Sequence, residues 1–260
     1  MAFQVYVINM SSSVERLEFI SNQLNYLKLP FKRIPGIDVT VNEDLKKKYY
    51  SKKLNSQKYH IPLTDGEIGC YIAQRNAWKE IIKDGVDYGL VLEDDIFLKN
   101  DLKLILDNIE DLKIQWHILK LTDLKESPRK AMEIGNFNKF KLVSYLKPPT
   151  LSCADLVSKE GAARLLDLSN PFGRPVDVDK QWFIFEGIKI YGLKPYSVET
   201  NDEFESVIDN FGNRREKLNI NFKIKRELKR LKQSSIYKFK ILFRKLKNFF
   251  RYKIHPYFRA

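Results

Sequence analysis

Two spacings of apolar residues recur along the chain up to about residue 200. Short apolar runs bounded by turn residues predict buried strands, at residues 3–8, 31–34, 88–92, 116–121, 140–146, 151–157, 188–191 and 196–198. Apolar residues three or four positions apart predict helices, at residues 14–27, 65–83, 102–112 and 159–168. Strands that alternate with helices predict an α/β sandwich with a mostly parallel central sheet. We expect the polar residues 42–60 and 125–138 to be surface loops.

The segment after residue 219 has a different pattern, in which apolar positions recur at helical spacing and lysine and arginine fill much of the remainder. The apolar positions are Ile236, Phe239, Phe243, Leu246, Phe250 and Ile254. They predict a basic amphipathic helix with aromatic residues on its apolar side. Such a helix can contact an anionic membrane surface, bind nucleic acid, or pack back against the domain. We favour the membrane, because a phosphate-binding patch needs no apolar stripe, and we expect no nucleic-acid partner.

All of the excess positive charge lies in this tail. The chain has a net charge of +13, and residues 214–260 carry 17 lysines and arginines against Glu216 and Glu227. Residues 1–213 carry 29 basic and 31 acidic residues. We therefore expect a globular domain over residues 1–213 and a basic helical tail over residues 214–260 that contacts a membrane surface.

The sequence also indicates where the protein resides. No run of 18 or more apolar residues occurs, so we expect no membrane span. The first residues enter a strand at once, without the basic and apolar segments of a secretory signal, which favours a cytoplasmic protein. Cys70 and Cys153 are then expected to be packed thiols rather than a disulfide. We expect structural roles for His60, His117 and His255.

Three consecutive carboxylates, Glu93-Asp94-Asp95, follow directly on the apolar run at residues 88–92. Carboxylates crowded at the end of a buried strand repel one another unless water or a cation screens them. Open α/β sheets bind ligands at this end of their strands, and carboxylate oxygens suit Mg²⁺ and Mn²⁺. We therefore favour a divalent cation that joins these carboxylates to a substrate diphosphate. The alternative is a solvated acidic turn that caps the next helix.

Five short motifs occur in an order that resembles glycosyltransferase family 25. They are Val7-Ile8-Asn9 with Arg16, Gly66-Glu67-Ile68-Gly69-Cys70 with Trp78, Leu92-Glu93-Asp94-Asp95, Ser158-Lys159-Glu160-Gly161-Ala162 with Leu165-Leu166, and Pro175-Val176-Asp177-Val178-Asp179. The family contains lipooligosaccharide-biosynthesis galactosyltransferases of Gram-negative bacteria and relatives that modify collagen. The resemblance covers about residues 3–200. The chain departs from the family pattern in two places. It has Ala73-Gln74 where the family commonly has Ser-His, and it has Leu151-Ser152-Cys153-Ala154-Asp155 where the family has Gly-Thr-x-x-Tyr.

The resemblance implies a GT-A-like, Rossmann-type fold that binds a nucleotide-sugar donor. It implies inverting, metal-dependent transfer of a hexose, most simply galactose from UDP-galactose, to a lipooligosaccharide or lipopolysaccharide glycan. Mn²⁺ or Mg²⁺ would stabilise the departing UDP. A glycolipid acceptor would place the enzyme at the inner face of the bacterial inner membrane, as a peripheral protein held by residues 219–260.

The resemblance also suggests roles for individual residues. We expect Asp95 to bind the metal directly and Glu93, two residues away on the same side of an extended segment, to bind it directly or through water. Asp94 would point the other way, toward donor hydroxyls, while Asn9 and Arg16 would contact the nucleotide.

Inversion needs a base that takes the acceptor proton. Our candidates are Asp177 and Asp179, which could instead cap a helix before Gln181, and Glu67 is a third possibility. We expect Trp182 to belong to the core, with stacking on an acceptor sugar as the alternative.

Two other function classes remain open from the residues alone. One is a non-catalytic membrane- or nucleic-acid-binding protein on a degenerate transferase scaffold, which the departure at Ala73-Gln74 would suit. The other is a different metal-dependent phosphoryl or nucleotidyl transferase, although the chain has no GxxxxGK[ST] or GxGxxG loop to hold phosphates.

Overall fold

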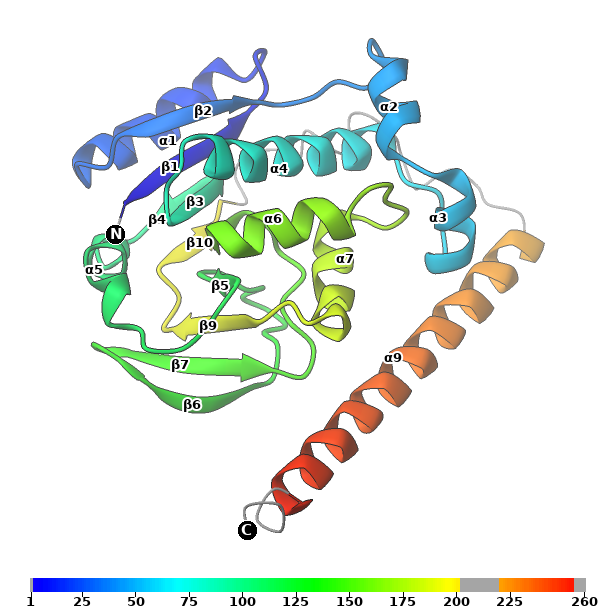
Figure 1. Ribbon diagram of the computed structural model, residues 1–260. Helices are drawn as coiled ribbons and strands as arrows, with labels where there is room; N and C mark the ends of the chain where they lie inside the picture. The colour runs from blue at the N-terminus through cyan, green and yellow to red at the C-terminus, as the bar shows by residue number, and fades with distance from the viewer. Residues whose placement is uncertain (1, 202–219, 255–260) are drawn as a thin grey trace.

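The computed structural model of the protein describes residues 2–201 and 220–254 (Figure 1). Its helices are α1 (Val14–Tyr26), α2 (Glu43–Tyr49), α3 (Lys52–Lys58), α4 (Asp65–Lys83), α5 (Leu102–Asn108), α6 (Lys159–Leu168), α7 (Val176–Phe183) and α9 (Ile220–Ile254), with 3₁₀ turns at Ile109–Asp111 and Ile184–Glu186. Its strands are β1 (Phe3–Asn9), β2 (Phe31–Pro35), β3 (Tyr88–Glu93), β4 (Ile96–Leu98), β5 (Ile118–Lys120), β6 (Ala131–Phe137), β7 (Phe140–Tyr145), β8 (Ala154–Ser158), β9 (Ile190–Lys194) and β10 (Val198–Thr200).

A central sheet of eight strands runs in the order β2-β1-β3-β8-β5-β9-β7-β6. β1 pairs in parallel with both β2 and β3, and β5 pairs in parallel with β9. β8 and β7 run antiparallel to both of their neighbours. Six of the eight strands therefore share one direction, which confirms the expected α/β fold with a mostly parallel sheet. β4 and β10 form a separate antiparallel pair.

Helices cover both faces of the sheet, so its central strands are buried on both sides. Successive side chains of a strand point to opposite faces, and β3 shows the result: Leu90 and Leu92 enter the hydrophobic cluster beneath α1 and α5, whereas Val91 enters the cluster beneath α4 and α6. This double burial explains why residues 88–92 form a continuous apolar run rather than an alternating one.

Two segments expected to be loops contain regular structure. α2 and α3 lie within residues 42–60, where Asn42 and Ser51 cap them by accepting hydrogen bonds from the backbone amides three residues on. β6 lies within residues 125–138 and pairs only with β7 at the sheet edge. Its side chains are mostly exposed, so it carries no hydrophobic alternation that a sequence pattern could reveal.

The helix predicted for the tail forms as α9, which lies beside α3 and α7 (Figure 1). It contacts the body through Tyr237, whose side chain is 5% exposed. The rings of Trp182 and Phe185 meet the Tyr237 ring edge-on, with centroids 5.2 and 4.9 Å away. The Tyr237 hydroxyl lies 3.2 Å from the carbonyl oxygen of Gln181, to which it donates.

The apolar stripe of α9 faces away from the body. Phe239 is 67% exposed and Phe243 is 63% exposed, and the other predicted stripe residues whose side chains are described, Ile236 and Leu246, are exposed too. The described residues of the stripe therefore do not pack against the domain. None of the described helices is long and apolar enough to span a bilayer. The expected domain boundary at residues 213 and 214, and His255, lie outside the described residues.

Candidate active site

The carboxyl ends of β1 and β3 bring the first group of predicted site residues together. The two strands pair in register, with Ile8 opposite Glu93, so Asn9 lies beside the acidic tripeptide. The Asn9 side-chain amide donates a hydrogen bond of 2.6 Å to Asp94 Oδ2. Asp94 is buried, and both Asn9 and Arg16 bind its carboxylate. The carboxylate therefore faces these protein groups rather than solvent.

Arg16 joins this group from the first turn of α1. Its guanidinium forms a short ion pair with Asp95 Oδ2 and lies 3.3 Å from Asp94 Oδ1. The Arg16 side chain is largely buried, so it is not a surface ion pair. The turn from β1 into α1 thus delivers a cation directly onto the carboxylates that end β3.

Glu93 lies beside this cluster without a partner of its own. No hydrogen bond or ion pair to its carboxylate occurs within the described part of the chain. Burial, followed by repulsion from Asp95 and Asp94, raises the pKa of Glu93 to about 8. The site therefore has more negative charge than Arg16 neutralises.

The carboxylate oxygens of this cluster suit a hard divalent cation whose remaining ligands come from the substrate. Over the described residues, no three His, Cys, Asp or Glu side chains converge into a metal cage. Mg²⁺ in nucleotide enzymes is commonly held by one or two carboxylates together with substrate phosphates, and Glu93 and Asp95 are the candidate carboxylates here. The Asn9 Oδ1 atom is also buried without a hydrogen-bond donor in the described residues.

The structure separates the two candidate bases. α7 begins at Val176, with Pro175 at its N-cap position, so capping by the aspartates, the alternative interpretation, is wrong. Asp179 is buried between Arg174, at 3.0 Å, and the Tyr71 hydroxyl, at 3.1 Å. Asp177 is partly exposed, and among the described residues its carboxylate accepts a hydrogen bond from the Val178 amide alone, at 2.8 Å.

Burial raises the pKa of Asp177 to about 6, while the nearby ammonium groups of Lys180 and Lys120 act in the opposite direction. A carboxylate with this pKa is ionised at neutral pH and is more basic than an ordinary aspartate. Glu67, the third candidate, forms a capping box at the start of α4 with Thr64. Asp177 is therefore the carboxylate best suited to take a proton.

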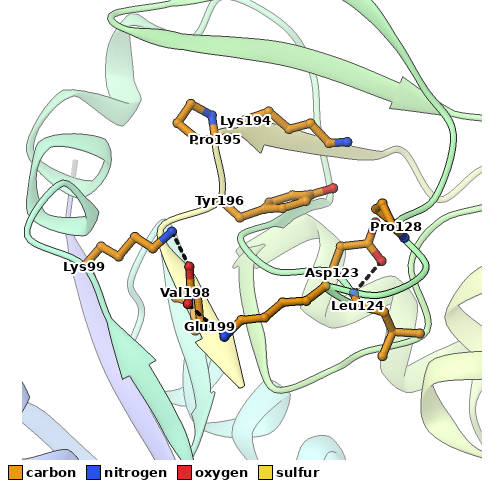
Figure 2. Close-up of a pocket in the computed structure, with 10 residues that line it drawn as sticks. Lys99, Asp123, Leu124, Pro128, Lys194, Pro195, Tyr196, Val198 and Glu199 are labelled. Atoms are coloured by element: carbon orange, nitrogen blue, oxygen red, sulfur yellow. Dashed lines mark hydrogen bonds and ion pairs between the residues drawn. The ribbon is translucent and has the colours of Figure 1, made fainter. Parts of the chain in front are cut away.

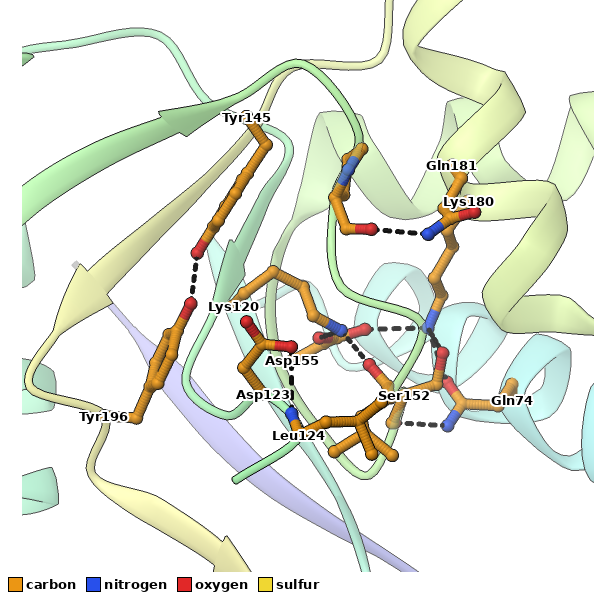
Figure 3. Close-up of polar contacts among 12 residues, drawn as sticks. Gln74, Lys120, Asp123, Leu124, Tyr145, Ser152, Asp155, Lys180, Gln181 and Tyr196 are labelled. Carbon is orange, nitrogen blue, oxygen red and sulfur yellow. Dashed lines mark hydrogen bonds and ion pairs between the residues drawn. The ribbon is translucent and has the colours of Figure 1, made fainter. Parts of the chain in front are cut away.

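Lys180, which follows Asp177 by three residues on α7, belongs to a buried ionic network that the sequence analysis did not find (Figure 3). Lys180 on α7 donates to Asp155 Oδ2 across 2.8 Å, and Lys120 on β5 lies 2.5 Å from Asp155 Oδ1. Burial alone would raise the pKa of Asp155, but the two ammonium groups lower it below its usual value. The network ties α7 to the centre of the sheet.

The positions that depart from the family pattern meet in this network. Lys180 also donates to Gln74 Oε1, at 3.3 Å, and to Ser152 Oγ, at 3.2 Å. The Gln74 amide in turn donates to the Ser152 carbonyl, at 3.0 Å (Figure 3). Gln74, Ser152 and Asp155 thus all contact the buried Lys180 side chain.

The same edge of the sheet continues to the ends of β5 and β9, where a cavity of about 290 Å³ opens (Figure 2). Asp123 follows β5 and accepts hydrogen bonds from the Leu124 and Arg129 amides, at 2.9 and 2.7 Å. Tyr196 follows β9, and its hydroxyl lies 2.7 Å from that of Tyr145. The sequence analysis missed Asp123, although it follows an apolar strand just as the residues after β3 do.

The cysteines agree with their predicted role, since Cys70 and Cys153 are free thiols. His117 is buried and its Nδ1 accepts the Lys189 amide at 2.9 Å, which is a structural contact.

Comparison with known proteins shows which chains resemble this one. Residues 2–180 match the family model described as glycosyltransferase family 25 (LPS biosynthesis protein). A putative glycosyltransferase of Haemophilus influenzae is 29% identical over 248 residues, covering 87% of this chain and 84% of that protein. Procollagen galactosyltransferase 1-B of Xenopus laevis is 30% identical over 189 residues, covering 68% of this chain. The match spans only 30% of the procollagen enzyme's length.

Among solved structures, a Drosophila β-1,4-galactosyltransferase 7 mutant in complex with manganese, UDP-Gal and xylobiose aligns with a TM-score of 0.42 and 9% identity, covering 87% of this chain and 80% of that one.

Proposed function

Because this chain belongs to glycosyltransferase family 25, we propose that it transfers galactose from UDP-galactose to a lipooligosaccharide or lipopolysaccharide glycan. The observation that carries the proposal is the joining of Asn9, Arg16 and the acidic tripeptide at the strand ends, with Asp177 as a second, separate carboxylate. Open α/β sheets bind nucleotides at such strand ends.

The donor would bind over the carboxyl ends of β1 and β3. Glu93 and Asp95 would hold Mn²⁺ or Mg²⁺, which when bound supplies positive charge to the departing diphosphate. In the structure, Arg16 forms an ion pair with the Asp95 carboxylate. A bound cation would therefore share that carboxylate with Arg16. Asn9, which donates to Asp94 at 2.6 Å, would hold that carboxylate beside the donor.

Asp177 would act as the general base. Its carboxylate takes the proton of the acceptor hydroxyl as the acceptor oxygen attacks the anomeric carbon of galactose. The new glycosidic bond forms on one face of the sugar while the bond to the UDP phosphate oxygen breaks on the other. UDP leaves with the bonding electrons, and the configuration at the anomeric carbon inverts.

The tail would hold the enzyme at the membrane that carries its acceptor. α9 presents exposed Phe239, Leu242 and Phe243 on the side away from the body, and lysines and arginines flank them. An amphipathic helix of this kind lies in the membrane interface, and each basic residue near an anionic leaflet adds about 1 kcal/mol. Residues 214–260 would thus form the membrane-contacting part of the protein beside the transferase domain, on the cytoplasmic face of the inner membrane.

Product analysis tests this proposal. The purified protein is incubated with lipooligosaccharide and a panel of UDP-sugars, and the linkage of the product is determined by NMR. A β-linked galactose from α-linked UDP-galactose is the expected product. Transfer from another UDP-sugar would correct the proposed donor specificity. A retained α-linkage would exclude Asp177 as a base for direct inversion. No transfer from any donor would favour the non-catalytic alternative.

A further inference from the structure

A second cavity, of about 480 Å³, lies between α9 and α7. Three aromatic and two cationic side chains contribute to its lining: Tyr59, Trp182, Tyr237, Lys147 and Arg230. Small-ligand sites have volumes in this range and combine aromatic walls with a few placed polar groups. None of the roles assigned above uses this cavity.

The cavity adjoins the helix that carries the proposed base. Val178, Gln181 and Trp182 of α7 line it, and Gln181 lies one helical turn after Asp177, on the same face of the helix. The Gln181 side-chain amide is held by the Pro148 carbonyl, at 2.5 Å. Gln181 thus places the cavity within one helical turn of Asp177 along α7.

The aromatic walls are fixed by contacts with the body. The Arg174 guanidinium lies 4.4 Å from the centre of the Trp182 ring and also binds Asp179, at 3.0 Å. Tyr237 also packs edge-on against Trp182. These contacts hold the partly exposed Trp182 side chain in one orientation, which lowers the entropic cost of binding a ligand against it.

The lining also determines what kind of ligand fits. Aromatic rings with polar groups beside them suit a pyranose, which has apolar C–H faces and hydroxyl edges. Lys147 and Arg230 add positive charge to the lining, although Glu227 pairs with Arg230 at 2.9 Å. A sugar bearing a carboxylate or phosphate matches this combination better than a neutral one.

We propose that this cavity binds an anionic sugar unit of the acceptor glycan, so that α9 completes the acceptor site of the transferase. The inference rests on the proposed function, because it assigns the cavity to the acceptor of that reaction. It gives the tail a second role: α9 supplies Tyr237 and Arg230 to the cavity from one face and an apolar stripe for the membrane from the other.

Calorimetry and kinetics with a lipid-free lipopolysaccharide core oligosaccharide test the inference in the full-length protein. Arg230→Gln should weaken binding of the acidic oligosaccharide about 10-fold and leave binding of a dephosphorylated, carboxyl-reduced oligosaccharide unchanged. Trp182→Leu should weaken both by about 10-fold, and Trp182→Phe should restore much of the loss. Lys238→Gln is the matched control, because it removes one charge from an exposed position of the same helix.

The readouts separate this inference from the proposed function. UDP-galactose hydrolysis without acceptor should be equal in all of these variants. If the protein hydrolyses donor and Arg230→Gln binds the oligosaccharide as tightly as Lys238→Gln, the cavity is not the acceptor site. If the oligosaccharide binds as expected but no UDP-sugar is hydrolysed, the cavity assignment holds as a glycan site and the transferase proposal fails.

Discussion

Lys180 donates a hydrogen bond to Asp155 across 2.8 Å, and both side chains are almost completely buried. This contact joins α7, which carries Asp177, to β8 in the middle of the sheet. Because Lys180 and Asp177 are three residues apart on one helix, the contact fixes both the position and the electrostatic surroundings of the proposed base. We therefore expect Lys180 to be a positioning residue for the proposed reaction.

Replacement of this lysine should change the pH dependence of transfer. In Lys180→Met, Asp177 loses a nearby positive charge, so the apparent pKa of the rising limb of kcat/KM should move upward from about 6. Stability should fall by about 3 kcal/mol, because a buried pair loses one partner. The measurements are a pH–rate profile and thermal unfolding, with the exposed Lys83→Met as control. An unchanged profile in a folded variant would remove Lys180 from this role.

Transfer should depend on the ionised form of Asp177. Because its pKa is raised to about 6, the rate should be constant near neutral pH and fall as the pH decreases through that value, when the carboxyl group becomes protonated and can no longer accept a proton. Asp177→Asn should lower kcat by about 10² to 10⁴-fold with little change in the KM for the donor. Full activity of Asp177→Asn would contradict this assignment.

Asp179 should behave as a structural residue instead. Asp179→Ala leaves the buried Arg174 guanidinium without its carboxylate partner, which should cost about 3 kcal/mol of unfolding free energy. Residual activity per folded molecule should exceed that of Asp177→Asn. Chemical denaturation and single-turnover transfer measure the two effects, and the opposite order of activities would assign the base to Asp179.

Membrane binding should depend on the outer face of α9. Phe239→Ser combined with Phe243→Ser should reduce binding to vesicles with anionic lipids by at least about 10-fold, since each exposed ring can bury apolar area in the interface. Transfer to a soluble acceptor should be unchanged. Tyr26→Ser is the matched control, because Tyr26 is also strongly exposed but lies on α1. Equal vesicle binding by the double variant and the control would refute the membrane role of the stripe.

The parts of the site that follow from local sequence were predictable. The apolar run at residues 88–92 identified β3, and the polar residues after it, together with Asn9 after β1, marked the edge where the site lies. Arg16 was found through a motif, but its contact with Asp95 depends on how α1 returns over the sheet.

The remaining parts depend on contacts between distant segments. Asp155 lies in an apolar strand and Lys180 in a short helix. Neither local sequence predicts a buried ion pair, because the pair forms only when β8 and α7 pack together. Asp177 and Asp179 are equivalent in sequence, and only the buried Arg174 and Tyr71 distinguish them. The face of α9 that packs against the body was likewise not predictable, because Tyr237 lies on the side of the helix opposite the predicted apolar stripe.

UDP release from UDP-galactose by the purified protein is the most direct test of metal-dependent transfer at the β1–β3 edge. The account predicts release with Mn²⁺ that is lost with chelator and in Asp95→Ala, and that persists in the exposed control Asp107→Ala. Release that continues at the same rate with chelator and in Asp95→Ala would contradict it.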